Sequence, residues 1–251
     1  MGDQPDEKPN LALRDVHLKI GSGEKVAICG RTGSGKSSLI ALLLKLLDPT
    51  PETEASLMID STPLRSMNRS ALRERIIAVP QEAVFLPDGS TFQANLDPSD
   101  VSSAEDCKAV LAAVDLWSFV QDRGGLNAGM SASTLSAGQR QLMSLGRALL
   151  RRRIRASNLG MGGGGSEGGV LLLDEVSSSV DHETERVMQE IIKKEFREYT
   201  VIAVSHRLEM IMDFDRVVVM DTGVVVEVGN PQVLAGEAES RFGELVRAGA
   251  K

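Results

Sequence analysis

The chain has few aromatic residues, few cysteines and no long apolar run. Of its 251 residues, 6 are Phe, 1 is Tyr, 1 is Trp and 2 are Cys. Two cysteines cannot build a disulfide framework, and Cys29 lies in an expected core strand, as suits a reduced cytosolic thiol. The longest apolar run is interrupted by Lys45 and is shorter than the roughly 18 residues that span a bilayer. The sequence therefore indicates neither a disulfide-stapled secreted domain nor a membrane-spanning segment.

Positive charge is also scarce. The chain carries 28 Lys and Arg against 35 Asp and Glu, a formal net charge of −7. This balance argues against binding nucleic acid through bulk charge. The basic run at residues 151–155 falls where a helix is expected to end, which is the end that cations stabilise. Residues 1–10 are too acidic and polar for a secretory signal and are expected to be disordered.

A glycine-rich segment at residues 30–37 matches the phosphate-binding pattern GxxxxGK[ST]. It follows an expected buried strand at 25–29 and precedes an expected helix at 38–47, so a bound anion would lie at a helix N-terminus. In such a loop, glycines turn backbone N–H groups inward, the lysine contacts β- and γ-phosphates, and the serine hydroxyl contacts Mg²⁺. The residues expected to contact the nucleotide are Gly30, Arg31, Thr32, Gly33, Ser34, Gly35, Lys36, Ser37 and Ser38.

Strands and helices alternate along most of the chain. We expect strands at 16–20, 57–60, 76–79, 170–174 and 200–205, helices at 70–75 and 182–197, and a hairpin at 216–228. This alternation indicates an α/β fold with a doubly wound, largely parallel sheet. Its core would comprise residues 11–81 and 170–247, with a helical subdomain inserted at 82–156, including helices at 104–120 and 134–151.

Residues 157–169 form a glycine-rich insert that reads as a flexible linker by composition. Three of its glycines satisfy GxGxxG by chance, because dinucleotide binding needs a strand before that pattern and a helix after it. The insert enters the next strand at the end opposite the expected ligand crevice. We therefore expect it to be catalytically silent.

Two acids, Asp174 and Glu175, end the apolar strand at 170–174. A carboxylate at the C-terminal end of a parallel strand reaches the crevice where α/β sheets bind ligands. Asp174 can hold Mg²⁺ through water, and Glu175 can accept a proton from an attacking water.

A second motif, Leu135-Ser-Ala-Gly-Gln139, opens the helix at 134–151. Ser136 and Gln139 fit a capping box, which explains those two residues locally. Gly138 has no role in a cap and is costly inside a helix, so it suggests close backbone approach by an external group. A helix N-terminus with Ser and Gly is also suited to an anion, which makes this a second candidate phosphate site.

The order of these segments resembles that of ATP-binding cassette domains, a RecA-like P-loop NTPase fold, over roughly residues 11–247. The resemblance rests on the glycine-rich loop, Gln81, the motif at 135–139, the acidic strand at 171–175, the segment at 178–181 and Ser205-His206. Asn95-Leu-Asp-Pro98 and residues 136–142 look most like the second cassette of the multidrug-resistance-associated (C) subfamily of transporters.

The resemblance implies a role for each matching residue. Lys36, Glu175 and His206 would be catalytic, and Mg²⁺ would lie near Ser37, Gln81 and Asp174. Gln81 would also contact ATP and sense the transmembrane domains. The signature residues Leu135, Ser136, Ala137, Gly138 and Gln139 would contact the ATP held by a partner, and Ser178 and Asp181 would cross the interface.

The resemblance also implies partners and a location. Family cassettes pair head to tail, so the expected partner is a second cassette, the first one of the same transporter. The domain would hydrolyse ATP at the cytosolic face of a membrane and drive export through transmembrane domains. His17 and His182 have no matching position and are interpreted as surface residues.

This chain departs from the family pattern near its start. Family cassettes usually stack an aromatic residue on adenine, but no aromatic residue precedes Phe85. We interpret this as a fragment of a longer transporter or as weakened ATP binding. Two alternatives to the motor function remain open: a cassette that binds ATP and regulates a partner without turnover, and a soluble cassette ATPase that acts on ribosomes or DNA.

Overall fold

A six-stranded sheet forms the centre of the computed structural model, which describes residues 11–51, 53, 56–158, 168–178 and 180–249. The strand order is β4-β5-β6-β1-β7-β8, and every neighbouring pair is parallel except β7 with β8. The strands are β1 (Lys25–Cys29), β4 (Ile76–Val79), β5 (Val170–Asp174), β6 (Thr200–Val204), β7 (Arg216–Asp221) and β8 (Val224–Gly229). This arrangement confirms the expected α/β fold with a largely parallel sheet.

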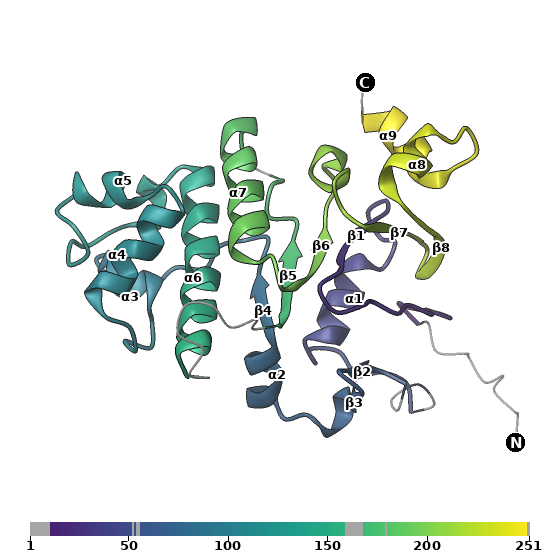
Figure 1. Cartoon of the computed structure of the whole chain (residues 1–251), viewed down its shortest axis with the longest axis horizontal. Coiled ribbons are helices and arrows are strands. Elements are labelled where there is room, and N and C mark those ends of the chain that lie inside the picture. The colour runs from purple at the N-terminus through teal and green to yellow at the C-terminus, as the bar shows by residue number, and fades with distance from the viewer. Residues whose placement is uncertain (1–10, 52, 54–55, 159–167, 179, 250–251) are drawn as a thin grey trace, which may run out of the picture.

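Helices flank the sheet, and a short hairpin lies below it in the view of Figure 1. The helices are α1 (Lys36–Leu43), α2 (Arg69–Arg75), α3 (Phe92–Leu96), α4 (Ala104–Ala113), α5 (Trp117–Gln121), α6 (Ala137–Asn158), α7 (His182–Glu195), α8 (Pro231–Gly236) and α9 (Arg241–Gly249). The 3₁₀ turns are η1 (Leu64–Ser66), η2 (Ala132–Thr134) and η3 (Leu208–Ile211). The hairpin pairs β2 (Met58–Ile59) with β3 (Thr62–Pro63).

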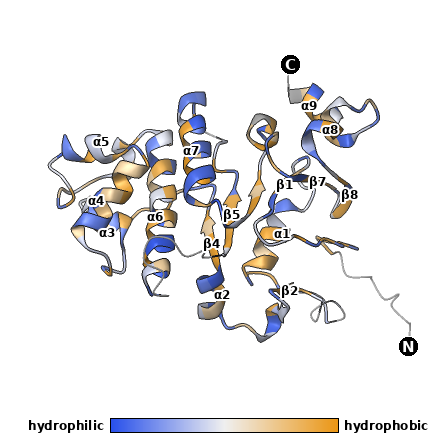
Figure 2. Cartoon of the chain, in the orientation of Figure 1, coloured by the Kyte–Doolittle hydropathy of each residue, from blue (hydrophilic) through white to orange (hydrophobic). Residues whose placement is uncertain are grey.

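Alternate residues of each central strand face opposite sides of the sheet, as period-two geometry requires. On one side, Ile28 and Leu172 pack with Leu39 and Ile40 of α1. The other side divides into two clusters: one joins β4, β5 and β6 to α6 and α7, and the other joins β1 and β7 to η3, α8 and α9. Both faces are therefore covered, and the apolar strands stand out in Figure 2. Most of the buried apolar residues are aliphatic, and few are aromatic.

The helices α3 to α6 occupy one end of the molecule, at the left of Figure 1. Trp117 and Phe119 are partly buried against the apolar cluster of this region, as expected. The predicted continuous helix at 104–120 is wrong. Asp115 has a positive φ of 57°, and α4 ends before it while α5 begins after it.

Two other element predictions also fail in detail. Residues 16–20 alternate in burial, and Leu18 and Ile20 pack against the core, yet they form no strand. The helix expected at 38–47 begins at Lys36 and ends at Leu43, because Lys45 adopts a positive φ of 54° and its amine donates to Met67 O.

Several surface and core predictions hold. Cys29 and Cys107 are buried free thiols, and the side chains of His17 and His182 are exposed. In the part of the chain that the structure describes, no helix is long and apolar enough to cross a membrane. Most of the glycine-rich insert, residues 159–167, and the N-terminal segment 1–10 lie outside the described residues.

Candidate functional site

The glycine-rich loop joins the end of β1 to the start of α1 and depends on glycine at two crowded positions. A Cβ at Gly30 would lie 2.3 Å from Met220 O and 2.6 Å from Ser34 Oγ. A Cβ at Gly35 would lie 3.1 Å from Ala12 O, and both glycines have positive φ. Larger residues would therefore distort the backbone that surrounds an anion.

Lys36 lies at the first position of α1 with its side chain turned into the loop. Its Nζ donates to Gly30 O at 2.9 Å and to Arg31 O at 3.2 Å. Burial lowers the pKa of Lys36, while the charges of Glu175, Cys29 and Asp174 oppose that shift. The hydroxyl of Ser34 is buried in the same loop and has no hydrogen-bond partner among the described residues. A polar atom left in this way fits a loop that completes its bonds with a phosphate.

The two acids at the end of β5 lie within electrostatic reach of Lys36. Burial raises the pKa of Asp174, the negative charge of Glu175 adds to the rise, and Lys36 opposes it. The attraction between Lys36 and Asp174 opposes the shift caused by burial in both residues. Leu172 of β5 also packs with Leu39 and Ile40 of α1, so the structure brings the glycine-rich loop and the acidic strand end together although they lie far apart in the sequence.

Glu175 and His206 form a close pair at the ends of neighbouring strands. Glu175 Oε1 lies 2.9 Å from His206 Nε2, and the side chains are 17% and 44% exposed. The N–H of Glu175 donates to Val204 O at 2.9 Å, which holds the residue with a positive φ of 47°. An acceptor so placed, with an imidazole beside it and access to solvent, is suited to hold and deprotonate a water.

The oxygen atoms available for a metal are of the kind that Mg²⁺ prefers. Ser37 offers a hydroxyl, Asp174 a carboxylate and Gln81 an amide oxygen, and Mg²⁺ usually keeps several waters in addition. Among the described residues there is no group of three or more His, Cys, Asp and Glu that could hold a metal. The donor set therefore fits a cation shared with phosphate oxygens and does not fit an all-protein cage.

Gln81 follows β4 and is exposed, while its backbone carbonyl accepts a hydrogen bond from α6. The buried Gln141 of α6 donates its Nε2 to Gln81 O at 2.5 Å. Arg147, also on α6, donates to Val84 O, three residues after Gln81, and to Asn95 O. Its guanidinium lies 4.9 Å from the centre of the Phe85 ring. The segment after Gln81 is thereby attached to α6.

The motif at 135–139 forms the N-terminus of α6, with the expected reciprocal cap. The N–H of Ser136 donates to Gln139 Oε1 at 2.9 Å, and the N–H of Gln139 donates to Ser136 Oγ at 3.1 Å. Leu135 is buried and its carbonyl accepts from Arg140, whereas Ser136 is exposed. Figure 1 shows α6 and α1 on either side of β4 and β5, so this motif does not form one site with the glycine-rich loop of its own chain.

The glycine inside that motif has a close neighbour in the same chain. A Cβ at Gly138 would lie 2.8 Å from Thr184 Oγ1 and 2.9 Å from Thr184 Cγ2. We expected an external group to approach closely at this position, and the structure shows instead a close neighbour within the chain, Thr184 of α7. The glycine is therefore explained by packing of α6 on α7, whether or not a phosphate also reaches it.

Asp181 begins α7 and fixes its first turn. Its Oδ1 accepts from the N–H of Thr184 and its Oδ2 from the hydroxyl of Thr184, both at 2.9 Å. These hydrogen bonds lower the pKa of Asp181. Ser178 is exposed, and its N–H donates to Glu175 O at 3.1 Å. Ser178 is thus bonded to the end of β5, and Asp181 to the first turn of α7.

Two polar residues next to the site were missed by the sequence analysis. Arg207 directly follows His206, and Glu185 lies in the first turn of α7. Arg207 Nη1 lies 2.6 Å from Glu185 Oε2, and the Glu185 side chain is 5% exposed. No local sequence pattern predicts that pairing. The only signal in the sequence is that Arg207 directly follows the candidate histidine.

A partly open cavity of about 550 Å³ lies between α7, β6 and η3. It is lined by Ser177 and Ser205 but by no residue of the glycine-rich loop. Residues of both apolar clusters on this face of the sheet, such as Ile192 and Ile211, also line it.

The comparisons with known proteins agree with this geometry. A family model described as "ABC transporter" matches residues 13–154. The "ABC-type transporter braE" of Annulohypoxylon truncatum is 68% identical over 247 residues, which are 98% of this chain and 17% of that protein. The "ABC transporter FGM5" of Gibberella zeae is 54% identical over 244 residues, 97% of this chain and 16% of that protein. The chain thus spans about a sixth of the length of these relatives.

A solved structure has the same fold. The structure of a bacterial Atm1-family ABC exporter with ATP bound superposes with a TM-score of 0.80 at 24% identity. The match covers 100% of this chain and 41% of that one. At this identity the likeness establishes the architecture of the sheet and its helices.

Proposed function

Because the chain belongs to the ABC transporter family, we propose that it binds ATP with Mg²⁺ and hydrolyses the ATP when paired with a second cassette. The observation that carries the proposal is the 2.9 Å contact between Glu175 and His206, at the end of a strand whose Asp174 interacts with Lys36. Phosphate-binding loop, acidic strand end and histidine come from β1, β5 and β6 and converge at one edge of the sheet. Ligands of parallel sheets bind at that edge.

Each residue of this group would contribute one part of the reaction. Lys36 neutralises charge on the β- and γ-phosphates, and the glycine-rich loop supplies backbone N–H groups. Glu175 accepts a proton from the attacking water while His206, beside it, holds the γ-phosphate and orients the water. Ser37, Gln81 and Asp174 would hold Mg²⁺, which supplies further charge neutralisation when bound.

The proposal includes a head-to-tail partner. Ser136 to Gln139 would contact the nucleotide held by the partner, because α6 and α1 lie on either side of β4 and β5 in the chain itself. Ser178 and Asp181 would lie at the interface between the two cassettes. The partner would be the first cassette of the same transporter.

The wider role proposed is export. In a full transporter, transmembrane domains would contact the segment after Gln81, and turnover at the cytosolic face of the membrane would drive substrate across it. The residues Asn95-Leu-Asp-Pro98 support placement in the multidrug-resistance-associated (C) subfamily, as its second cassette. The length of the relatives leaves room for those further domains.

Replacing Glu175 tests the proposal. We expect Glu175→Gln to lower the ATP turnover of the chain mixed with a matching first cassette by roughly 10²–10⁴-fold, because no proton acceptor remains. Binding of Mg²⁺-ATP, measured by fluorescence titration, should stay unchanged. Glu190→Gln, on the exposed side of α7, is the matched control and should leave turnover intact.

Three results of that experiment separate the candidate functions. Loss of turnover with retained binding supports the motor function. Equal turnover of wild type and Glu175→Gln contradicts the assignment of Glu175. Tight ATP binding with no turnover in any pairing indicates the regulatory cassette.

A further inference from the structure

The histidine of the candidate site lies at the tip of a closed three-residue turn. Ser205 Oγ accepts from the N–H of Arg207 at 2.9 Å and donates to Arg207 O at 3.0 Å. These two bonds join the residues on either side of His206. The position of His206 opposite Glu175 therefore depends on where Arg207 is held.

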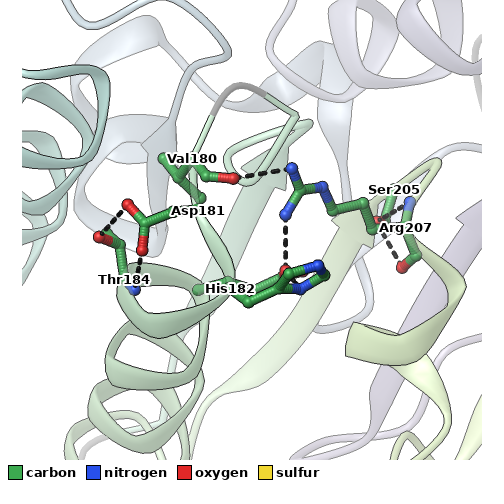
Figure 3. Close-up of polar contacts among 7 residues, drawn as sticks. Val180, Asp181, His182, Thr184, Ser205 and Arg207 are labelled. Carbon is green, nitrogen blue, oxygen red and sulfur yellow. Dashed lines mark hydrogen bonds and ion pairs between the residues drawn. The ribbon is translucent and has the colours of Figure 1, made fainter.

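Arg207 is held by two separate groups of another segment (Figure 3). Its Nη1 donates to Glu185 Oε2 at 2.6 Å, and its Nη2 donates to Val180 O at 2.7 Å. Glu185 lies in the first turn of α7, and Val180 directly precedes the Asp181 cap. One guanidinium thus connects the turn after β6 both to α7 and to the segment at 178–181.

The pairing needs an arginine. The planar guanidinium offers N–H donors in fixed, divergent directions, whereas a lysine amine is a single point charge on a flexible stem. Glu185 is buried, and its other oxygen, Oε1, has no hydrogen-bond partner among the described residues. His182 Nδ1 lies 3.6 Å from Glu185 Oε2 but is 87% exposed. Arg207 is therefore the close, partly buried cation that compensates this carboxylate.

The connection continues to the N-terminus of α6. Asp181 accepts both of its bonds from Thr184, and Thr184 is the residue packed against Gly138. The contacts form an unbroken series from Gly138 through Thr184 and Asp181 to Val180, then through Arg207 to His206. Chains of packed and hydrogen-bonded groups are one route by which energetic coupling travels between distant surfaces.

We propose that Arg207 is a positioning residue that holds His206 against Glu175 and couples this pair to Val180 and Asp181. Displacement of Val180 and Asp181 by a docking cassette then moves Arg207 and with it His206. The inference rests on the proposed function and adds the regulation of the site: turnover responds to the partner through the ion pair of Arg207 with Glu185.

Steady-state kinetics of Arg207→Lys and Glu185→Gln test the coupling, in the chain paired with a matching first cassette. We expect kcat to fall about tenfold or more while KM for ATP stays within about twofold, because nucleotide contacts remain. The double variant should be no worse than the more impaired single variant, since both remove one interaction.

The matched control is a second ion pair on the same helix. Arg152 Nη1 of α6 lies 3.1 Å from Glu195 Oε2 at the far end of α7. Glu195→Gln removes a comparable pair away from His206 and should leave kcat unchanged. A full kcat in Arg207→Lys, or an equal loss in Glu195→Gln, overturns the proposal.

A measurement independent of turnover keeps this inference separate from the proposed function. If wild type hydrolyses ATP no faster than Glu175→Gln, the proposed function fails and amide hydrogen exchange decides the coupling. Glu185→Gln should raise exchange in both residues 180–184 and residues 205–208, and Glu195→Gln in neither. A rise confined to one segment, or absent from both, overturns the coupling.

Discussion

Glu175 occupies a backbone conformation that residues other than glycine rarely adopt, with φ at 47°. Such a conformation costs about 1–3 kcal/mol and persists only where surrounding contacts determine it. Here the N–H of Glu175 is bonded to Val204 O, and the carboxylate faces His206. The contacts that hold this conformation thus include the histidine that follows the neighbouring strand, β6.

The candidate site could be predicted from the sequence where its signals are local. The glycines and Lys36 form one continuous pattern, and Asp174 and Glu175 directly follow an apolar run. The ion pair of Arg207 with Glu185 has no local pattern, because it depends on how far α7 lies from the end of β6. The sequence therefore predicted the charged residues that belong to local motifs and missed the pair that packing between distant segments brings together.

The two thiols provide a test at the residue scale. Burial raises the pKa of Cys29 to about 12, against a smaller opposing effect of Lys36. Burial and nearby acids raise the pKa of Cys107 to about 11. Because the thiolate is the reactive form, we expect neither cysteine to react with a disulfide reagent in the folded protein at pH 8. Both should react in urea, which serves as the control, and rapid labelling of the folded protein would contradict this.

Helix ends divide the element predictions into those that succeeded and those that failed. The start of α7 at His182 was correctly predicted, and the side chain of Asp181, directly before it, bonds within the first turn. The end of α1 and the break at Asp115 were missed, because single residues with positive φ interrupt otherwise helical patterns. Residues 16–20 show that alternating burial alone does not make a strand, since no neighbouring strand pairs with them.

The contact of α6 with α7 provides a test at the element scale. Gly138→Ala should lower the free energy of unfolding by about 1–3 kcal/mol, because its Cβ would overlap Thr184. Gly146→Ala on the same helix is the matched control: its nearest contact is Leu96 Cδ1 at 3.2 Å, the end of a flexible side chain. That variant should cost less, offset by the helix propensity of alanine.

Urea unfolding of both variants measures the difference. Thr184→Ala should recover part of the loss in the Gly138→Ala background, because it removes the two nearest atoms. Equal stability of Gly138→Ala and wild type would show that α7 moves away at no cost.

At the scale of the whole molecule, the alternation of strands and helices predicted the sheet but not its strand order. β6 lies between β5 and β1, although β1 comes first in the chain. This order places Glu175, His206 and the glycine-rich loop at neighbouring strand ends. No spacing in the sequence determines it, because it arises from pairings between distant residues.

The glycine-rich insert provides a test at this scale. The insert precedes Val170, the first residue of β5, whereas the candidate site lies at the other end of that strand. At the usual rise per residue, Val170 and Asp174 are about 13 Å apart. We expect deletion of residues 161–165 to leave both kcat and KM for ATP unchanged, as measured in the paired ATPase assay. An equal-length replacement by alternating Gly and Ser separates length from composition. Loss of most turnover after the deletion would refute the expectation that the insert is silent.

The position of β1 in the sheet also sets when the candidate site can form during synthesis. Both strands that neighbour β1, β6 and β7, are translated long after it. Gly23 bonds to Thr200, 177 residues later in the chain, and Lys25 bonds to Asp215, 190 residues later. At about 5–20 residues per second, a ribosome needs roughly 10–40 s to make that stretch. During this interval β1 has neither neighbouring strand, and its apolar residues are open to chaperones or to aggregation. The loop that is translated first therefore takes its final shape among the last parts of the domain.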